Sequence, residues 1–128
     1  MTPTSITYHK GSKTLEVQFS DGVTAELTAE ALRVFSPSAE VRGHSPEQSV
    51  LQTGKKHVSI DKIEAIGNYA IRIMFDDGHD TGIYSWDYLR ELHDTFDEHW
   101  TKYVEELTKA NASRLPAIPV GHWSPSKT

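Results

Sequence analysis

The stretch that decides the fold runs from Gly67 to Leu89 and reads GNYAIRIMFDDGHDTGIYSWDYL. Between residues 71 and 75 large apolar side chains take every second position, the period of a strand with one buried face. Asp77-Gly78 follows, and because this dipeptide tolerates positive φ it predicts a tight turn. Residues 81–84 then return as the second arm of a hairpin, and the hydroxyl of Ser85 predicts the start of a helix.

The same pattern occurs once more, 56 residues upstream. Leu15, Val17 and Phe19 precede Asp21-Gly22 just as Ile71, Ile73 and Phe75 precede Asp77-Gly78 (71 − 15 = 56). Two interpretations remain open. The match is either convergent, since a strand, a turn and a returning strand are common, or a pseudo-repeat of two hairpins whose apolar faces pack together.

The remaining periodicities complete an α+β prediction. A short helix is expected from Thr28 to Phe35, a loop over 36–46, and one or two strands between 58 and 66. After Ser85 apolar residues recur at spacings of three and four as far as Leu107, which predicts one long C-terminal amphipathic helix with a kink near residues 93–94. We therefore expect antiparallel hairpins, or a meander, packed with a short helix and this long one.

Composition limits the class of protein. The 128 residues predict a single domain over 1–110, followed by a flexible proline-containing tail over 111–128. There is no cysteine, which excludes disulfides, thiolate metal sites and a cysteine nucleophile. A net charge of −5 argues against nucleic acid as a partner, and no apolar run approaches the roughly 18 residues of a membrane span. A cytoplasmic protein that binds neither nucleic acid nor membrane is expected.

Two histidines are candidates for chemistry, although the common enzyme motifs are missing from the sequence. His79 follows the turn glycine and lies beside Asp77 and Asp80, so it could bind a metal or act as a base, or simply hydrogen-bond its own turn. His44 lies in the loop over 36–46, and loops on a rigid scaffold commonly carry function.

That loop also predicts a binding surface. Its candidate residues are Ser36, Ser38, Glu40, Arg42 and His44. A basic patch of Arg33, Lys55 and Lys56 could join it on this otherwise acidic chain. The patch would suit an anion or an acidic partner surface, or the three cations could be merely solvated.

Three runs carry a family resemblance: LRVFSPSAEVRGH from residue 32, GK from residue 54 and IEAIGNYAIRIMFDDGHDTGIYSWDYL from residue 63. They resemble a family of small bacterial domains of unknown function related to the N-terminal domain of gamma-butyrobetaine hydroxylase, over about residues 5–108. Similar domains are also attached to iron–sulfur carrier proteins of the Mrp type. The resemblance implies an α+β fold and a role as an accessory or interaction module.

In the hydroxylases this domain resembles a zinc module with three cysteines and one histidine. Carried over by position, these ligands fall at Ser36, Ser38, Val41 and His79, so three of the four are replaced. Serine is a poor zinc ligand and valine is none, and a structural zinc is therefore not expected. The hydroxylase's oxygenase chemistry is not expected either, since its catalytic jelly roll has no counterpart in this sequence.

The sequence thus favours a non-catalytic accessory module that contacts an unknown protein partner and is linked to metal or iron–sulfur handling, with no obligatory cofactor. One alternative is a site for iron or another divalent metal at His79, completed by His44, Asp77 or Asp80. Another is a small enzyme with His79 or His44 as general base. A homodimer through the long helix also remains open. In each case we expect the loop over 36–46 to be ordered near His79.

Overall fold

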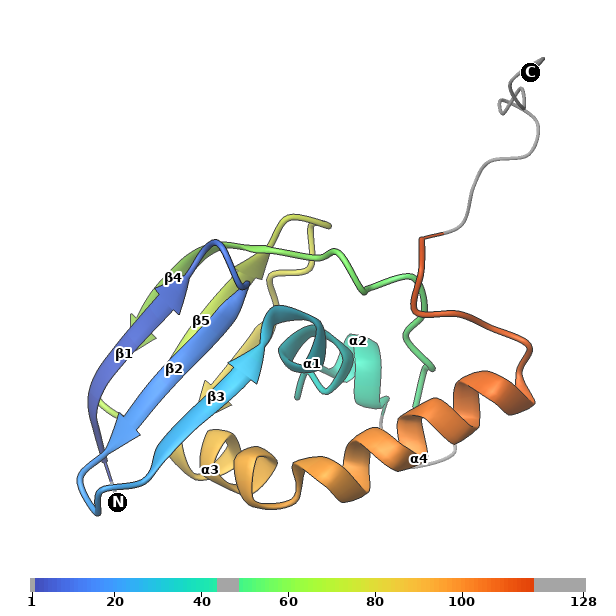
Figure 1. Cartoon of the computed structure of the whole chain (residues 1–128). Coiled ribbons are helices and arrows are strands. Elements are labelled where there is room, and N and C mark those ends of the chain that lie inside the picture. Colours follow the sequence, from blue (N-terminus) through green and yellow to red (C-terminus); the bar gives the residue numbers. More distant parts are fainter. Residues whose placement is uncertain (1, 44–48, 117–128) are drawn as a thin grey trace.

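The computed structural model describes residues 2–43 and 49–116 and confirms the α+β prediction (Figure 1). Two antiparallel sheets have the strand orders β1-β2-β3 and β4-β5-β6. The elements are β1 (Pro3–His9), β2 (Thr14–Phe19), β3 (Thr24–Thr28), α1 (Ala29–Val34), α2 (Ala39–Arg42), β4 (Ile60–Ile66), β5 (Ala70–Phe75), β6 (Gly82–Ser85), α3 (Trp86–Asp94) and α4 (Phe96–Lys109). In this part of the chain no helix has the length and apolarity needed to cross a membrane.

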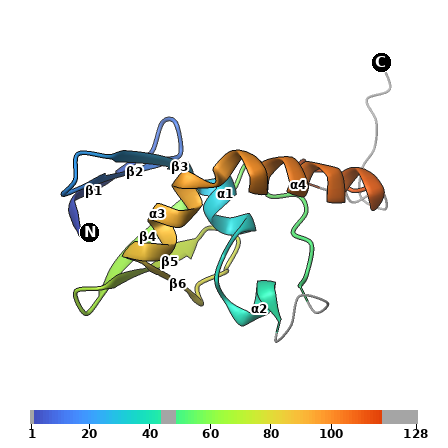
Figure 2. The same cartoon turned by 90° about the horizontal axis from the view of Figure 1, so that it is seen from below.

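The two sheets bury their apolar faces against each other. Leu15 and Val17 of β2 share one core with Ile71 and Ile73 of β5, and all four are 3% exposed or less. Figure 2 shows the sheets as separate layers, with α1 and α3 beside β3. This packing is the geometry expected for the pseudo-repeat, in which the apolar faces of two similar hairpins meet.

Each sheet runs directly into a helix whose cap the sequence predicted. The Oγ1 of Thr28 accepts a hydrogen bond from the backbone N–H of Ala31 at 3.1 Å, and the Oγ of Ser85 accepts one from Tyr88 at 3.0 Å. These bonds satisfy N–H groups that have no partner inside a helix. The hairpins and the first turns of α1 and α3 are therefore built from local signals.

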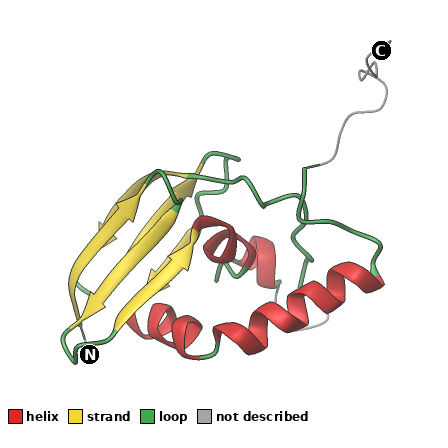
Figure 3. Cartoon of the chain, in the orientation of Figure 1, coloured by secondary structure: helices red, strands yellow, loops and turns green. Residues whose placement is uncertain are grey.

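The predicted long C-terminal helix is divided in two at Thr95, close to the expected kink (Figure 3). Thr95 adopts φ −114° and ψ 19°, and its hydroxyl donates to the carbonyl of Glu91 at 2.8 Å. The change of direction lets Tyr103 and Leu107 of α4 pack on Val34 in a second, smaller apolar cluster. α4 thereby covers α1 rather than the sheets.

Two local predictions differ from the structure. The predicted loop over 36–46 contains a short helix, α2, which is capped by Ser38; His44 and Pro46 lie outside the described residues. The predicted tail over 111–128 begins with a docked segment, because the N–H groups of Gly54 and Lys56 donate to the carbonyls of Ser113 and Arg114, each at 2.9 Å. The described fold thus continues to Pro116, and residues 117–128 lie outside it.

The docked segment is held by a buried carboxylate. Glu30 on α1 is 7% exposed and accepts two hydrogen bonds of 2.7 Å from the guanidinium of Arg114. That guanidinium also lies over the Trp100 ring, 5.1 Å from its centroid. Sequence reasoning missed this contact because the two residues are 84 positions apart.

Candidate functional site

The β5–β6 turn directs the side chain of His79 into the protein. Gly78 has φ +92°, which favours glycine, and the N–H of Phe75 donates to the carbonyl of His79 at 3.0 Å. The N–H of His79 in turn donates to Oδ1 of Asp77 at 3.1 Å. The predicted hydrogen bonding of His79 within its own turn is therefore present, but only through the backbone. Its imidazole is 3% exposed and lies inside the protein.

Both ring nitrogens of His79 have partners from the segment after α1. Nε2 lies 2.9 Å from Oγ of Ser36, and Nδ1 lies 3.2 Å from Oε2 of Glu40. Because a carboxylate accepts, Nδ1 carries the proton and Nε2 accepts from the Ser36 hydroxyl. Burial, helped by the charge of Arg33, lowers the pKa of His79 below its ordinary value, although Glu40 and Asp77 oppose the shift.

The order serine, histidine, glutamate matches the connectivity of a hydrolytic triad, but the nucleophile is closed off. Ser36 is 0% exposed, and its Oγ also accepts from the N–H of Ser38 at 3.3 Å. A Cβ placed on Gly82 would lie only 2.7 Å from this Oγ, so β6 passes directly over it. A substrate carbonyl has no route to Ser36. The contacts of Ser36 and Glu40 with His79 instead join the segment after α1 to the β5–β6 hairpin.

The four positions of the resembled zinc module do converge, but they do not fit a zinc ion. Ser36 and His79 are directly hydrogen-bonded, Oγ of Ser38 lies 2.6 Å from Oγ1 of Thr81, and Val41 is buried at 7% exposure. Hydroxyls and an isopropyl group replace the thiolates that zinc prefers. Hydrogen bonds and apolar contacts fill this place instead.

The acids predicted as metal ligands point to other partners. Asp80 lies 3.3 Å from the guanidinium of Arg72, and Asp77 pairs with Arg33 and Lys55. Within residues 2–43 and 49–116 no group of three histidine, aspartate or glutamate side chains is arranged to hold a metal ion. His44, the other predicted ligand and binding-loop residue, lies outside this part of the chain.

Asp77 is the centre of an ion network. Its Oδ2 accepts from Nε of Arg33 at 2.8 Å and from Nζ of Lys55 at 2.6 Å, and Arg33 also donates to the side chain of Gln52. Burial disfavours the charged carboxylate, but the bonds from Lys55, His79 and Arg33 outweigh it and lower the pKa of Asp77 to about 2. Two cations of the predicted basic patch, Arg33 and Lys55, thus share the single negative charge of Asp77. Of the three cations only Lys56 is exposed.

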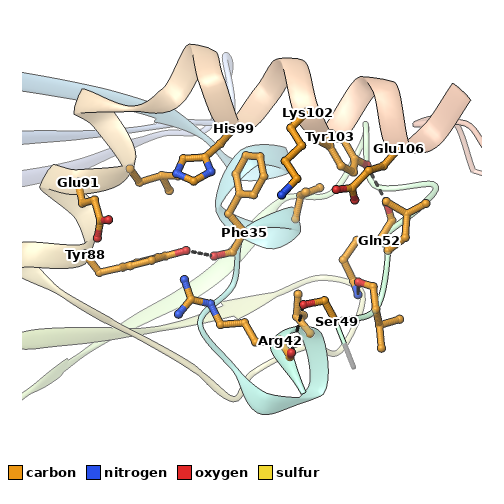
Figure 4. Close-up of a pocket in the computed structure, with 15 residues that line it drawn as sticks. Phe35, Arg42, Ser49, Gln52, Tyr88, Glu91, His99, Lys102, Tyr103 and Glu106 are labelled. Carbon is orange, nitrogen blue, oxygen red and sulfur yellow. Dashed lines mark hydrogen bonds between the residues drawn. The ribbon is translucent and has the colours of Figure 1, made fainter. Parts of the chain in front are cut away.

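A pocket of about 430 Å³ opens beside this network, between α4, α3 and the segments 34–42 and 49–52 (Figure 4). It is lined by aromatic rings (Phe35, Tyr88 and Tyr103) and by charged side chains that include Arg42 and Lys102. The Tyr88 hydroxyl donates to the carbonyl of Phe35, and burial raises the pKa of Tyr88, so this residue stays neutral. Of the predicted binding-loop residues that the structure describes, only Arg42 lines the pocket. The two acids of the pocket, Glu91 and Glu106, were missed because the helical periodicity places them on a solvated face.

Comparison with protein families identifies the family of the chain. The family described as "Gamma-butyrobetaine hydroxylase-like, N-terminal" matches residues 6–90, which is more than half of the chain. The chain belongs to this family. No curated protein sequence matches it.

Solved structures of similar chains extend the match beyond the family segment. Two NMR solution structures share 44% and 45% sequence identity, cover 99% and 91% of this family member and 96% and 87% of their own chains, and both give a TM-score of 0.77. A crystal structure of a protein of unknown function from Acidithiobacillus ferrooxidans, assigned to the DUF971 family, shares 41% identity over 71% of this chain and 91% of its own, with a TM-score of 0.61. These neighbours support the fold.

Proposed function

We propose that this gamma-butyrobetaine hydroxylase-like domain is a non-catalytic cytoplasmic module that acts by contact with a protein partner. The observation that carries the proposal is the closed state of the His79 cluster. Both ring nitrogens are bonded within the protein, and the Ser36 hydroxyl has no exposed surface. A general base or nucleophile must reach the atom on which it acts, and here the imidazole and the Ser36 hydroxyl are bonded to other groups of the protein.

Exposed apolar side chains supply contact points for such a partner. Tyr69 is 58% exposed, Ile83 on β6 is 48% exposed and Val104 on α4 is 40% exposed. Large apolar and aromatic residues contribute most to protein interfaces. The resemblance to domains attached to iron–sulfur carrier proteins favours a partner from metal or iron–sulfur handling.

A labile divalent metal at His79 is the second candidate. It is favoured by one observation: the Glu40 side chain, which covers Nδ1 of His79, is itself 62% exposed and can swing into solvent. A metal would then have an imidazole and a carboxylate as its first two ligands, a donor set that suits iron or manganese.

Elemental analysis separates the two candidates. Untagged protein is prepared anaerobically without chelator as wild type, His79→Ala and His9→Ala. His9 is a matched control, since its Nε2 lies 3.2 Å from Oε1 of Glu16 in an exposed histidine–glutamate pair. We expect the same low metal content in all three. Near-stoichiometric metal in wild type and His9→Ala that is lost in His79→Ala would instead support a metal site at His79 as the function of the domain.

Retention of a partner tests the proposal directly. Wild type, Ile83→Glu and Val104→Glu are immobilised, and extract of the source cells is passed over each. The two substitutions lie on different elements, β6 and α4, so one partner surface would include only one of them. We therefore expect a partner protein that is retained by wild type and by one variant but not by the other. Equal retention by all three folded proteins, or no retention by any, would contradict a specific contact.

A further inference from the structure

The pocket beside α4 has the size of a small-molecule site. Its volume of about 430 Å³ lies within the roughly 300–1,000 Å³ typical of ligand pockets. It lies between packed helices, and its residues come from segments far apart in the sequence. None of the functions discussed so far uses it.

The apolar part of the pocket is held rigidly. The Phe35 ring packs edge-on against Tyr103, with centroids 5.9 Å apart, and lies tilted against the His99 ring, with centroids 5.8 Å apart. The Tyr103 hydroxyl donates to the carbonyl of Gln52 at 2.7 Å, which fixes α4 to the facing segment. A flat or aliphatic group entering here would meet surfaces that are already in place.

Two cations reach the pocket from facing elements. Figure 4 shows Lys102 descending from α4 beside Phe35, and Arg42 extending from α2 toward Tyr88. The Arg42 guanidinium lies 4.9 Å from the centroid of the Tyr88 ring. Over the ranges that the structure describes, neither cation forms an ion pair with a carboxylate. Stacking on Tyr88 holds the guanidinium in place, and its planar set of five N–H donors suits a planar anion such as a carboxylate.

Two acids also line the pocket, so the sign of the ligand's charge has to be argued. Glu91 and Glu106 lie on either side of the cations in Figure 4. Among the described residues neither carboxylate has a hydrogen bond or an ion pair, whereas Arg42 is held over the Tyr88 ring. A prearranged charge loses less conformational entropy on binding, and this difference favours an anionic ligand.

We propose that this pocket binds a small organic carboxylate, with its anionic group between Arg42 and Lys102 and its apolar body against Phe35 and Tyr103. The inference goes beyond the proposed function, because contact with a protein partner does not require the pocket to be filled.

The test is a titration of isotope-labelled protein followed by amide chemical shifts. The probes are phenylacetate, indole-3-acetate and hexanoate, each taken to about 10 mM, which covers the weak affinities of small ligands. Phenylacetamide and phenethylamine are the neutral and cationic counterparts of phenylacetate. We expect saturable shifts at Phe35, Leu51 and Tyr103 with at least one carboxylate, and at least about tenfold weaker binding of its amide.

Charge variants on α4 then test the geometry. Lys102→Gln is expected to weaken carboxylate binding about tenfold, because a charge-assisted hydrogen bond is lost. Glu106→Gln should strengthen it severalfold by removing a like charge. Lys109→Gln removes the same charge as Lys102→Gln near the end of the helix, outside the pocket lining, and should leave binding unchanged. Thermal unfolding confirms that each variant is folded.

Three results would overturn the proposal. The first is the absence of saturable binding of all three carboxylates to folded wild type. The second is equal or tighter binding of phenylacetamide or phenethylamine. The third is a loss of affinity in Lys102→Gln no greater than in Lys109→Gln. Tighter binding of the amine would assign the pocket to a cation held by Glu91 and Glu106 instead.

Discussion

Replacing Asp77 by asparagine should destabilise the protein by about 2 kcal/mol at pH 7. A pKa of about 2 against the ordinary 3.8 corresponds to roughly 2.4 kcal/mol of stabilisation before screening by solvent. Since the Asp77 side chain is 22% exposed, screening reduces this contribution to about 1–1.5 kcal/mol. Loss of the carboxylate also leaves the Arg33 side chain, only 9% exposed, without its counter-charge, which costs about another 1 kcal/mol.

Asp80→Asn is the matched control. It makes the same chemical change three residues away, at a carboxylate that is 52% exposed and 3.3 Å from the guanidinium of Arg72. An exposed pair of this kind contributes about 0–1 kcal/mol. The free energy of unfolding is measured for wild type and both variants by urea denaturation, followed by tryptophan fluorescence.

The contribution of Asp77 to the free energy of unfolding should depend on pH. Because the folded state lowers the pKa of Asp77, its stabilisation is complete above pH 3.8 and is lost as the pH falls toward about 2. The difference between wild type and Asp77→Asn should therefore stay constant down to about pH 4 and shrink below it. A difference under about 0.5 kcal/mol at pH 7, or one that persists unchanged at pH 2, would refute the ion network as a source of stability.

Three further predictions concern other buried contacts. Gly82→Ala should cost about 2–3 kcal/mol, because the new Cβ would lie 2.7 Å from Oγ of Ser36. Arg114→Gln should cost about 2–3 kcal/mol, because Glu30, 7% exposed, would lose its counter-charge. The stability of wild type should fall relative to His79→Gln as the pH drops below 6.5, because the folded state lowers the pKa of His79 and the unfolded chain takes up its proton first.

Controls for these predictions lie in the same chain. Gly11→Ala, where a Cβ would meet nothing within 4 Å, should change the denaturation midpoint little, and an equal effect of Gly82→Ala would argue against the clash. Lys109→Gln removes a cation near the end of α4 and should leave stability within about 0.5 kcal/mol of wild type; an Arg114→Gln variant equally close to wild type would contradict the role of the Glu30 pair. For His79 the measurement is the melting temperature from pH 7 to pH 5, and parallel curves for wild type and His79→Gln would show that the imidazole titrates as it does in the unfolded chain.

Local signals were enough to predict the hairpins and caps. Gly22 and Gly78 adopt φ of +91° and +92° in the predicted turns, and Thr28 and Ser85 cap the predicted helices. Each of these features depends on residues a few positions apart, so composition and spacing reveal it. The break at Thr95 has no glycine or proline to mark it, and for that reason the sequence indicated only a kink.

The candidate site was predicted only in part. The turn placed His79 beside Asp77, and the family resemblance placed Ser36 and Ser38 near His79. In the structure Ser36 is hydrogen-bonded to His79, and Ser38 to Thr81. The closing of His79 by Glu40 and the neutralisation of Arg33 were not predicted. They depend on side-chain contacts across 39 and 44 positions (79 − 40 = 39), which no local pattern encodes.

The sequence by itself determined the strands, the turns, the caps and the absence of cysteine chemistry, because these follow from neighbouring residues and residue types. Only the tertiary structure decided which charges are free to act. Arg33 and Lys55 belong to the predicted basic patch, yet both are paired with Asp77. Arg42 and Lys102 line a pocket that no sequence motif indicated. Ion pairing depends on distances of about 3 Å between segments far apart in the chain, and folding alone sets these distances.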